Sequence, residues 1–306
     1  MSTTQPPVGI PVRRFQRARA IFPKPGAEPS TASWPVRIVL LALCVIWMIP
    51  ALGLLVTSVR NEDDASTSGW WTALFNPFGS DWSLSNYDEV LNNGGMGAAF
   101  VNSLVVTIPA TVIPILIAAF AAYAFTFMRF PGRDFFFVLC VALLVVPIQV
   151  AFIPMLKLFG EFDLNGTFLA VWLVHTGFGM PLAIYTLRNY MATLPFEIIE
   201  SAKVDGASHF TTFWRLIVPM SVPAIAAFAI FQFLWVWNDL LVALIFLGAG
   251  ENQVVTVKLA GLVGQFGQDW HLLTAGAFIS MAVPLLVFFS LQRFFVRGLT
   301  AGAVKG

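Results

Sequence analysis

The sequence is poor in charged residues and in cysteine. Asp, Glu, Lys and Arg make up only 11% of the 306 residues, whereas a soluble domain carries roughly 25%. The two cysteines, Cys44 and Cys140, lie in separate apolar segments, where a thiol behaves as a small hydrophobic group. The first deficit excludes an ordinary soluble domain, and the second excludes a disulfide framework or a cysteine-based metal site.

Motifs for catalysis are also missing. The sequence has no GxxxxGK[ST] run to hold phosphate groups, and it has no recognisable nucleophile, paired carboxylates or metal-ligand cluster. We therefore expect a chain that is not an enzyme and that binds no cofactor or metal of its own. The Lys and Arg residues are scattered between apolar runs without forming a basic face, so we expect no nucleic-acid partner.

Apolar residues, in contrast, make up 58% of the chain. Six uncharged runs approach or exceed the ~20 residues that cross a bilayer as a helix. They cover residues 38–59, 98–128, 135–156, 164–187, 216–238 and 272–292. The sequence therefore predicts an all-α, polytopic protein in contact with membrane lipid, with a transmembrane domain over residues 36–306. An even number of spans places both termini on the same side.

The basic residues predict which side that is. Residues 1–35 are rich in Pro, Ser and Thr and contain several Arg residues, so we expect a disordered N-terminal tail. Lys and Arg are retained in cytoplasmic segments. If the N-terminus is cytoplasmic, all of the 17 Lys and Arg residues except Arg60, Lys157 and Lys258 fall on that side. We therefore predict that the tail and both termini are cytoplasmic.

The segment at residues 194–219, LPFEIIESAKVDGASHFTTFWRLIVP, is unusually regular for a loop. Pro195 suits the first turn of a helix, and Gly206 suits the left-handed residue that ends one. Asp205 or Ser208 is suited to cap a second helix. The segment therefore predicts a cytoplasmic helical hairpin. Such a hairpin either docks into a groove of a partner or packs beneath its own bundle, and the residues alone leave both interpretations open.

Motifs within this hairpin resemble those of a known family. Glu200-Ser201-Ala202, then Asp205-Gly206-Ala207, and later Pro219 are similar to the EAA loop of binding-protein-dependent ABC importer permeases. Ser201 replaces the usual Ala, a change from one small residue to another. Further segments resemble carbohydrate permeases, in particular the second permease subunit of maltose and α-glucoside transporters. They are WSLSNYDEVL (82–91), FVNSL (100–104), AAYAF (121–125), WND (237–239) and GLTAGAVKG (298–306).

The resemblance implies an ABC importer permease fold in a bacterial cell membrane and a role in carbohydrate import. It implies a second permease subunit that completes the pathway, two ATPase subunits that bind ATP and Mg, and an extracellular sugar-binding protein. It assigns ATPase coupling to Glu200, Ser201, Ala202, Asp205, Gly206, Ala207 and Pro219. The substrate it suggests is an oligosaccharide such as an α-glucoside, although the sequence does not specify which sugar.

Polar and aromatic residues in the apolar runs are candidates for lining a sugar pathway, because aromatic rings stack on sugars and amides bind hydroxyl groups. The candidates are Gln149, His175, Gln232, Trp235, Trp237, Asn238 and Asp239. An ionised carboxylate at the bilayer centre costs at least ~2.5 kcal/mol, so Asp239 is expected to face protein or water. A structural role at a helix break and a pathway role are both open for Asp239, as are packing and ligand contact for His175.

Prolines in two of the runs predict local distortion. Pro109 and Pro114 in the second run, and Pro147 and Pro154 in the third, are expected to kink their helices and to open backbone carbonyls to the cavity.

Hydropathy alone leaves two alternatives to the importer interpretation. A secondary transporter or channel for a small polar solute fits the same apolar runs, and so does a structural membrane scaffold. The hairpin discriminates among them, because neither alternative needs a helix presented to a soluble motor.

Overall fold

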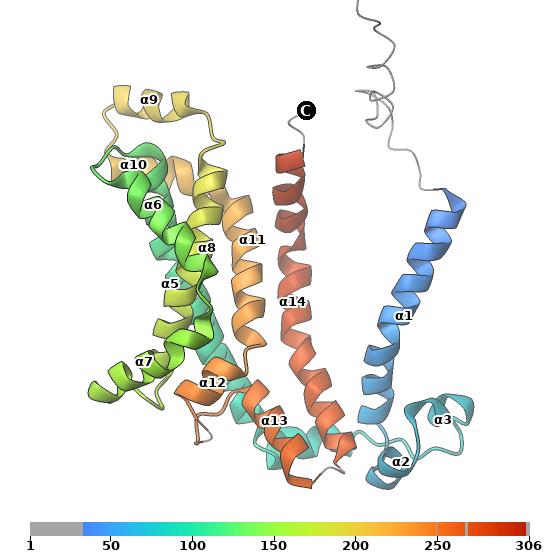
Figure 1. Ribbon diagram of the computed structural model, residues 1–306. Helices are drawn as coiled ribbons and strands as arrows, with labels where there is room; N and C mark the ends of the chain where they lie inside the picture. The colour runs from blue at the N-terminus through green and yellow to red at the C-terminus, as the bar shows by residue number, and fades with distance from the viewer. Residues whose placement is uncertain (1–32, 249, 267–268, 304–306) are drawn as a thin grey trace, which may run out of the picture. The chain divides into compact units, whose positions relative to one another are not determined.

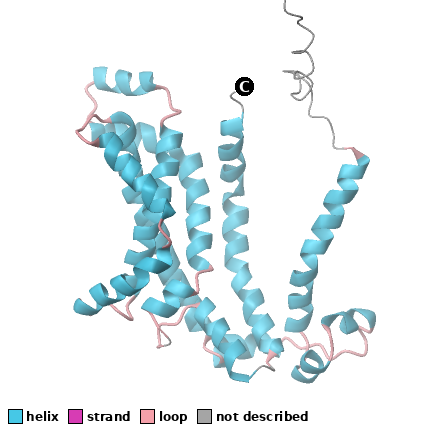
Figure 2. Cartoon of the chain, viewed as in Figure 1, coloured by secondary structure: helices cyan, strands magenta, loops and turns pink. Residues whose placement is uncertain are grey.

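The computed structural model describes residues 33–248, 250–266 and 269–303. Within these residues the chain is helical, and its strand-type pairing is limited to an isolated bridge between Arg60 and Trp82 (Figure 2). The α-helices are α1 (Trp34–Ser58), α2 (Glu62–Thr67), α3 (Trp70–Phe75), α4 (Ser85–Asp88), α5 (Met96–Phe127), α6 (Arg133–Ala142), α7 (Ile148–Glu161), α8 (Phe168–Met191), α9 (Phe196–Val204), α10 (His209–Thr212), α11 (Val218–Trp237), α12 (Leu241–Phe246), α13 (Val255–Phe266) and α14 (Trp270–Ala303). Two π-helical turns, η3 (Glu89–Asn93) and η5 (Phe213–Ile217), and one 3-10 turn, η4 (Leu143–Val145), join them.

Five helical segments in the described residues are long and apolar enough to cross a membrane. They are Trp34–Ser58, Met96–Phe127, Phe168–Met191, His209–Trp237 and Trp270–Gln292. They correspond to five of the six predicted spans. A sixth is obtained if the pair formed by residues 133–145 and 148–161 counts as one span.

That pair corresponds to the predicted third span and is bent next to Pro147, one of the two prolines expected to kink it. The two segments are bent by 101° at a break next to Pro147. Proline has no N–H group and disfavours helical geometry at the preceding residue, and Val146 is extended, with φ −75° and ψ 120°. Pro154, in contrast, lies inside the continuous helix α7. The apolar run at residues 135–156 is therefore a sharply broken element.

The chain divides into two compact units, Met1–Ala51 and Leu52–Gly306. In the first unit, α1 begins at Trp34, within the segment predicted as a tail, because the second helical residue, Pro35, is tolerated in a first turn. The rest of the predicted tail, residues 1–32, lies outside the described residues.

The second unit is built around α5 and α8, which pack along each other, with α11 packed on α5, α8 and α14 (Figure 1). Ala110, Ala118 and Ala122 of α5 have no exposed surface, and such small residues let helices approach closely. The helices α9 and α10 lie at one end of this bundle, the hairpin end, and α12 and α13 lie at the opposite end (Figure 1).

Each end has its own apolar core. The hairpin end includes the buried residues Ile115, Tyr123, Phe127, Ile184, Leu187, Met191, Ile199, Phe213 and Ile217. The opposite end includes Val106, Ala110, Phe152, Phe159, Val171, Val174, Val236, Val242 and Phe246. Both cores share α5, α8 and α11, so these three helices connect the two ends.

Candidate functional site

The hairpin at residues 194–219 forms as its turn chemistry predicts. Helix α9 follows Pro195 and ends at Asp205, and Gly206 is left-handed, with φ 76°. The amide of Ala207 donates to the carbonyl of Ala202 at 2.9 Å, and the amide of Gly206 donates to Lys203 at 3.0 Å. These two bonds form a Schellman motif, which satisfies the last carbonyls of the helix. The turn is therefore fixed by its own backbone.

The second helix of the hairpin starts from a side-chain cap. The hydroxyl of Ser208 accepts a hydrogen bond from the amide of Thr211 at 3.2 Å. Of the two caps that the sequence allows, Asp205 and Ser208, the structure uses Ser208. Helix α10 then continues through the π-turn η5 into α11 as one helical segment, His209–Trp237. The hairpin is therefore joined directly to a candidate membrane span.

The hairpin has an inner and an outer face. Ile199 and Ala202 are buried, at 1% and 6% exposure, so they pack toward the protein. The exposed residues of the predicted coupling set are Glu200, Ser201, Asp205, Gly206 and Pro219, and Ala207 is half-buried. The outer face thus presents two acidic side chains and small groups, whereas Ala202 serves packing within the chain.

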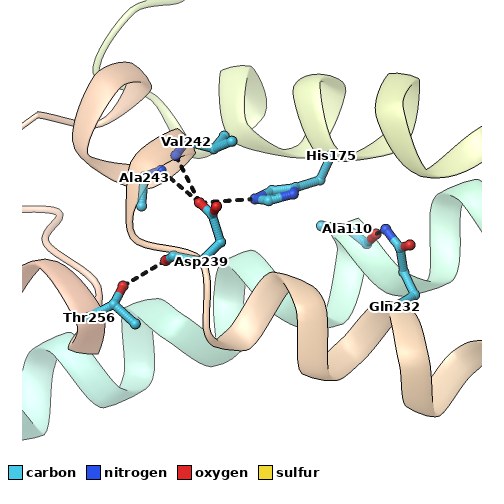
Figure 3. Close-up of polar contacts among 7 residues, drawn as sticks. All are labelled: Ala110, His175, Gln232, Asp239, Val242, Ala243 and Thr256. Carbon is cyan, nitrogen blue, oxygen red and sulfur yellow. Dashed lines mark hydrogen bonds and ion pairs between the residues drawn. The ribbon is translucent and has the colours of Figure 1, made fainter. Parts of the chain in front are cut away.

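At the opposite end, the carboxylate of Asp239 caps a helix. Asp239 follows the end of α11 at Trp237, and its Oδ2 accepts hydrogen bonds from the amides of Val242 at 2.8 Å and Ala243 at 3.2 Å (Figure 3). These amides belong to the first turn of α12, where N–H groups lack partners in the helix itself. The backbone carbonyl of Asp239 accepts from the hydroxyl of Thr256 at 2.7 Å. Asp239 therefore joins α11, α12 and α13.

The environment of Asp239 also affects its charge. Its side chain is only 13% exposed. Burial raises the pKa of this carboxyl, and the hydrogen bonds from Ala243 and Val242 act in the opposite direction by favouring the charged form. Nε2 of His175, on α8, lies 3.9 Å from Oδ2 (Figure 3). The ring of His175 is almost fully buried and packs edge-on against Trp235, with centroids 5.1 Å apart.

Gln232 of α11 binds a carbonyl that a proline has freed. In an α-helix the carbonyl of Ala110 accepts from the residue four positions later, but that residue is Pro114, which has no N–H group. Nε2 of Gln232 donates to this carbonyl at 3.2 Å (Figure 3). A Cβ atom on Gly179 of α8 would lie 2.7 Å from the same Nε2. Gly179 therefore leaves the space through which Gln232 reaches α5.

The same arrangement occurs at two further prolines. Pro109 frees the carbonyl of Val105, which accepts from Nε1 of Trp172 at 3.0 Å. Pro284 frees the carbonyl of Ser280, which accepts from Nε1 of Trp237 at 3.1 Å. Helix α5 is continuous across both of its prolines. At Pro109 and Pro114, as at Pro284, the carbonyl lacks its helical donor, but a side chain from a neighbouring helix binds it, so it is not open to a cavity as predicted.

The structure brings together some of the predicted pathway residues and separates others. His175, Trp235 and Asp239 lie in one cluster. Gln232 and Trp237 are buried between helices of this chain, at 1% and 4% exposure, and their nitrogen atoms bind backbone. Trp172 was not among the predicted residues, although the proline four residues after Val105 marked its carbonyl partner.

The two remaining pathway candidates are exposed. Gln149 lies at the start of α7, next to the break at Pro147. Asn238 is exposed at the end of α11, and its amide donates to the carbonyl of Leu234 at 2.7 Å. In the part of the chain that the structure describes, no group of three or more His, Cys, Asp and Glu residues is arranged to hold a metal ion.

Comparisons with known proteins agree with this architecture. A family described as "Binding-protein-dependent transport system inner membrane component" matches residues 114–301. The osmoprotective compounds uptake permease protein GgtD of Synechocystis sp. is 58% identical over 273 residues, which cover 89% of this chain and 92% of GgtD. The α-glucoside transport system permease protein AglG of Rhizobium meliloti is 43% identical, over 90% of this chain and 98% of AglG.

A solved structure shares the fold. One chain of a bacterial ABC transporter involved in the import of the acidic polysaccharide alginate superposes with a TM-score of 0.61 at 19% identity. The match covers 87% of this chain and 99% of the other. The predicted all-α, polytopic ABC importer permease fold is thereby confirmed.

Proposed function

This chain belongs to the family of binding-protein-dependent transport system inner membrane components, and from that membership we propose that it is a permease subunit of an ATP-driven carbohydrate importer. In this proposal it forms the translocation pathway with a second, different permease subunit. Two cytoplasmic ATPase subunits supply the energy and bind ATP and Mg, and an extracellular binding protein delivers the sugar. Family membership favours this function over a secondary transporter, a channel or a structural scaffold.

The observation that carries the proposal is the form of the hairpin. Its turn is rigid, because the Schellman bonds and the Ser208 cap satisfy its backbone. Of its inner residues, Ile199 belongs to the apolar core at the hairpin end of the bundle. Its outer face leaves Glu200 and Ser201 free to contact a partner. A rigid helix with one unoccupied face suits docking into a groove, and we assign ATPase coupling to this outer face.

The proposed orientation follows from the same assignment. The hairpin and both termini are cytoplasmic, in a bacterial cell membrane, as the distribution of Lys and Arg predicts. The end with Asp239, α12 and α13 is then extracellular. Among the pathway candidates, the exposed Gln149 and Asn238 are the ones available to a sugar, and Asp239 acts as a structural cap.

For the substrate we propose an α-glucoside that also serves as an osmoprotectant. AglG is named for α-glucosides and GgtD for osmoprotective compounds. A non-reducing α-glucoside such as trehalose belongs to both chemical classes. The His175 and Asp239 cluster is compatible with a neutral solute, because the Asp239 carboxylate is bound by the backbone amides of Val242 and Ala243.

The test is reconstitution of the whole complex in liposomes, together with the binding protein. The candidate substrates are trehalose, sucrose, maltose, glycine betaine and an alginate oligosaccharide, each tested separately. We expect ATP-dependent uptake of one or more α-glucosides and ATPase stimulation by the loaded binding protein. Uptake driven by an ion gradient without ATP would contradict the proposal. Uptake of glycine betaine alone would be consistent with an ATP-driven importer but would contradict a sugar as its substrate.

A further inference from the structure

A hydrogen bond between two side chains joins the hairpin to helix α5. The hydroxyl of Tyr123 lies 2.9 Å from Nδ1 of His209. Tyr123 lies near the hairpin end of α5 and is only 4% exposed. His209 is the first residue of α10 and is exposed. The bond therefore reaches from the core of the bundle to the surface of the hairpin.

His209 is rigidly connected to the turn of the hairpin. Only Ala207 and Ser208 separate it from the left-handed Gly206, and both are held by the Schellman and capping bonds described above. A displacement of α9 must therefore carry the backbone of His209 with it. Since Tyr123 binds the ring of His209, this displacement also pulls or pushes on α5 through the hydrogen bond.

The other contacts at this point are aromatic. Phe213 stacks on Phe120 with centroids 4.4 Å apart, and it packs edge-on against Tyr123 at 5.4 Å. These contacts hold the hairpin on the bundle in stacked and edge-to-face arrangements. A hydrogen bond weakens steeply when its angle changes, so the bond between Tyr123 and His209 fixes the register.

The helix changes its geometry immediately after this bond. The π-turn η5 covers Phe213–Ile217, between α10 and the span α11. Such turns are rare and occur frequently at functional sites. If α10 shifted without being held to α5, a change in the geometry of this π-turn could absorb the movement, and α11 would not move. A fixed contact with α5 gives the movement a second route into the bundle.

We propose that Tyr123 and His209 are positioning residues that transmit displacement of the hairpin to α5. This inference rests on the proposed coupling of the hairpin to an ATPase. Without the hydrogen bond, the hairpin still docks and the complex still assembles, but part of each displacement is lost at the π-turn. The expected defect is therefore in transport per ATP hydrolysed and not in assembly.

The test uses the full complex in liposomes and measures sugar transported per ATP hydrolysed. Tyr123→Phe removes one oxygen atom, and His209→Ala removes the ring nitrogen that this oxygen bonds. A hydrogen bond of this kind contributes about 0.5–1.5 kcal/mol, which corresponds to a roughly two- to twelvefold loss of coupling. We expect a loss in this range for each variant and no further loss in the double variant. His209→Asn, whose amide takes the place of Nδ1, should restore most of the coupling.

Tyr190→Phe is the matched control, because the hydroxyl of Tyr190 binds at 3.3 Å the carbonyl of Met220, a residue beyond the hairpin. It should couple as the wild type does. Normal coupling in Tyr123→Phe, additive losses in the double variant, or an equal loss in Tyr190→Phe would each overturn the inference. Poor recovery of ATPase subunits with Tyr123→Phe would also count against it. If the wild-type complex itself shows no sugar-stimulated hydrolysis, the proposed function fails instead.

Discussion

The two ends of the bundle are held together by different kinds of contact. At the end with α12 and α13, side chains bind backbone groups: Asp239 caps α12, and Gln232, Trp172 and Trp237 fill carbonyls that prolines have freed. At the hairpin end, aromatic and aliphatic packing dominates, and the bonds between Tyr123 and His209 and between Tyr190 and the Met220 carbonyl add directional links.

This difference indicates which end is built to move. Bonds between a side chain and a buried backbone group hold helices at a fixed distance and rotation, because an unsatisfied partner costs about 1–3 kcal/mol. The hydrophobic effect is non-directional, so apolar packing requires no specific bonding partner. We infer that α5, α8, α11 and α12 form a fixed frame at one end, while the hairpin changes position at the other.

The largest effect is expected at Asp239. Asp239→Ala leaves the amides of Val242 and Ala243 without their acceptor, and the loss of a cap with buried donors should cost about 1–3 kcal/mol. Asp88→Ala is the control, because Asp88 is exposed and surface substitutions usually stay within about 0.5 kcal/mol. Thermal unfolding and yield of the complex measure the difference. Equal values for the two variants would show that the Asp239 cap does not hold this end.

A comparable but smaller effect is expected at Gly179. In Gly179→Ala the new methyl would lie 2.7 Å from Gln232 Nε2, so the glutamine must leave the carbonyl of Ala110, at about 1–3 kcal/mol of lost stability. Part of this is offset by the higher helix propensity of Ala, about 0.8–1.0 kcal/mol.

Gly177→Ala provides the control on the same helix, because a Cβ atom there meets nothing within 4 Å. It should leave thermal stability unchanged or raise it. A destabilised Gly177→Ala with an unaffected Gly179→Ala would contradict the role given to Gln232.

At the hairpin end, Gly206→Val should act through backbone strain alone. A Cβ atom at Gly206 meets nothing within 4 Å, but its φ of 76° lies in the left-handed region. The penalty is on the order of 1–3 kcal/mol, and Gly206→Asn should cost less because Asn tolerates this region. We expect the amount of ATPase that co-purifies to decrease from Gly206→Asn through Gly206→Ala to Gly206→Val. Equal recovery for the three would show that the turn does not control docking.

The smallest perturbation tests the orientation of the two ends. Ser66 and Ser201 are both exposed in the structure. Each is replaced by a single cysteine in a chain that lacks Cys44 and Cys140. A membrane-impermeant thiol reagent added to intact cells should label Ser66→Cys and spare Ser201→Cys. The reverse pattern would invert the proposed topology.

The sequence predicts the hairpin well because its determinants are local. Gly206 and Ser208 act on neighbours within a few residues, so turn chemistry is sufficient to place them. The bend at Pro147 was anticipated only as a kink, because an apolar run of spanning length hides a 101° change of direction. For Ala202, spacing alone did not reveal that the methyl group faces inward.

The polar contacts of the opposite end are not predictable from spacing in the same way. His175 and Asp239 come from different helices, and so do Gln232 and Ala110. The prolines mark the carbonyls that need a donor, but the donor depends on which helices are neighbours. Trp172 was therefore missed, and Gln232 and Trp237 were given a pathway role although their nitrogen atoms bind backbone.

The central claim is that the outer face of the hairpin receives the ATPase, and photo-cross-linking tests it most directly. A photoreactive amino acid replaces Ser201 on the exposed face of α9, and in a second variant it replaces Ser66 in α2, which is also exposed. After illumination of the assembled complex in the membrane, the account predicts an ATPase adduct at position 201 and none at position 66. Absence of an ATPase adduct at position 201, or equal adducts at both positions, would contradict it.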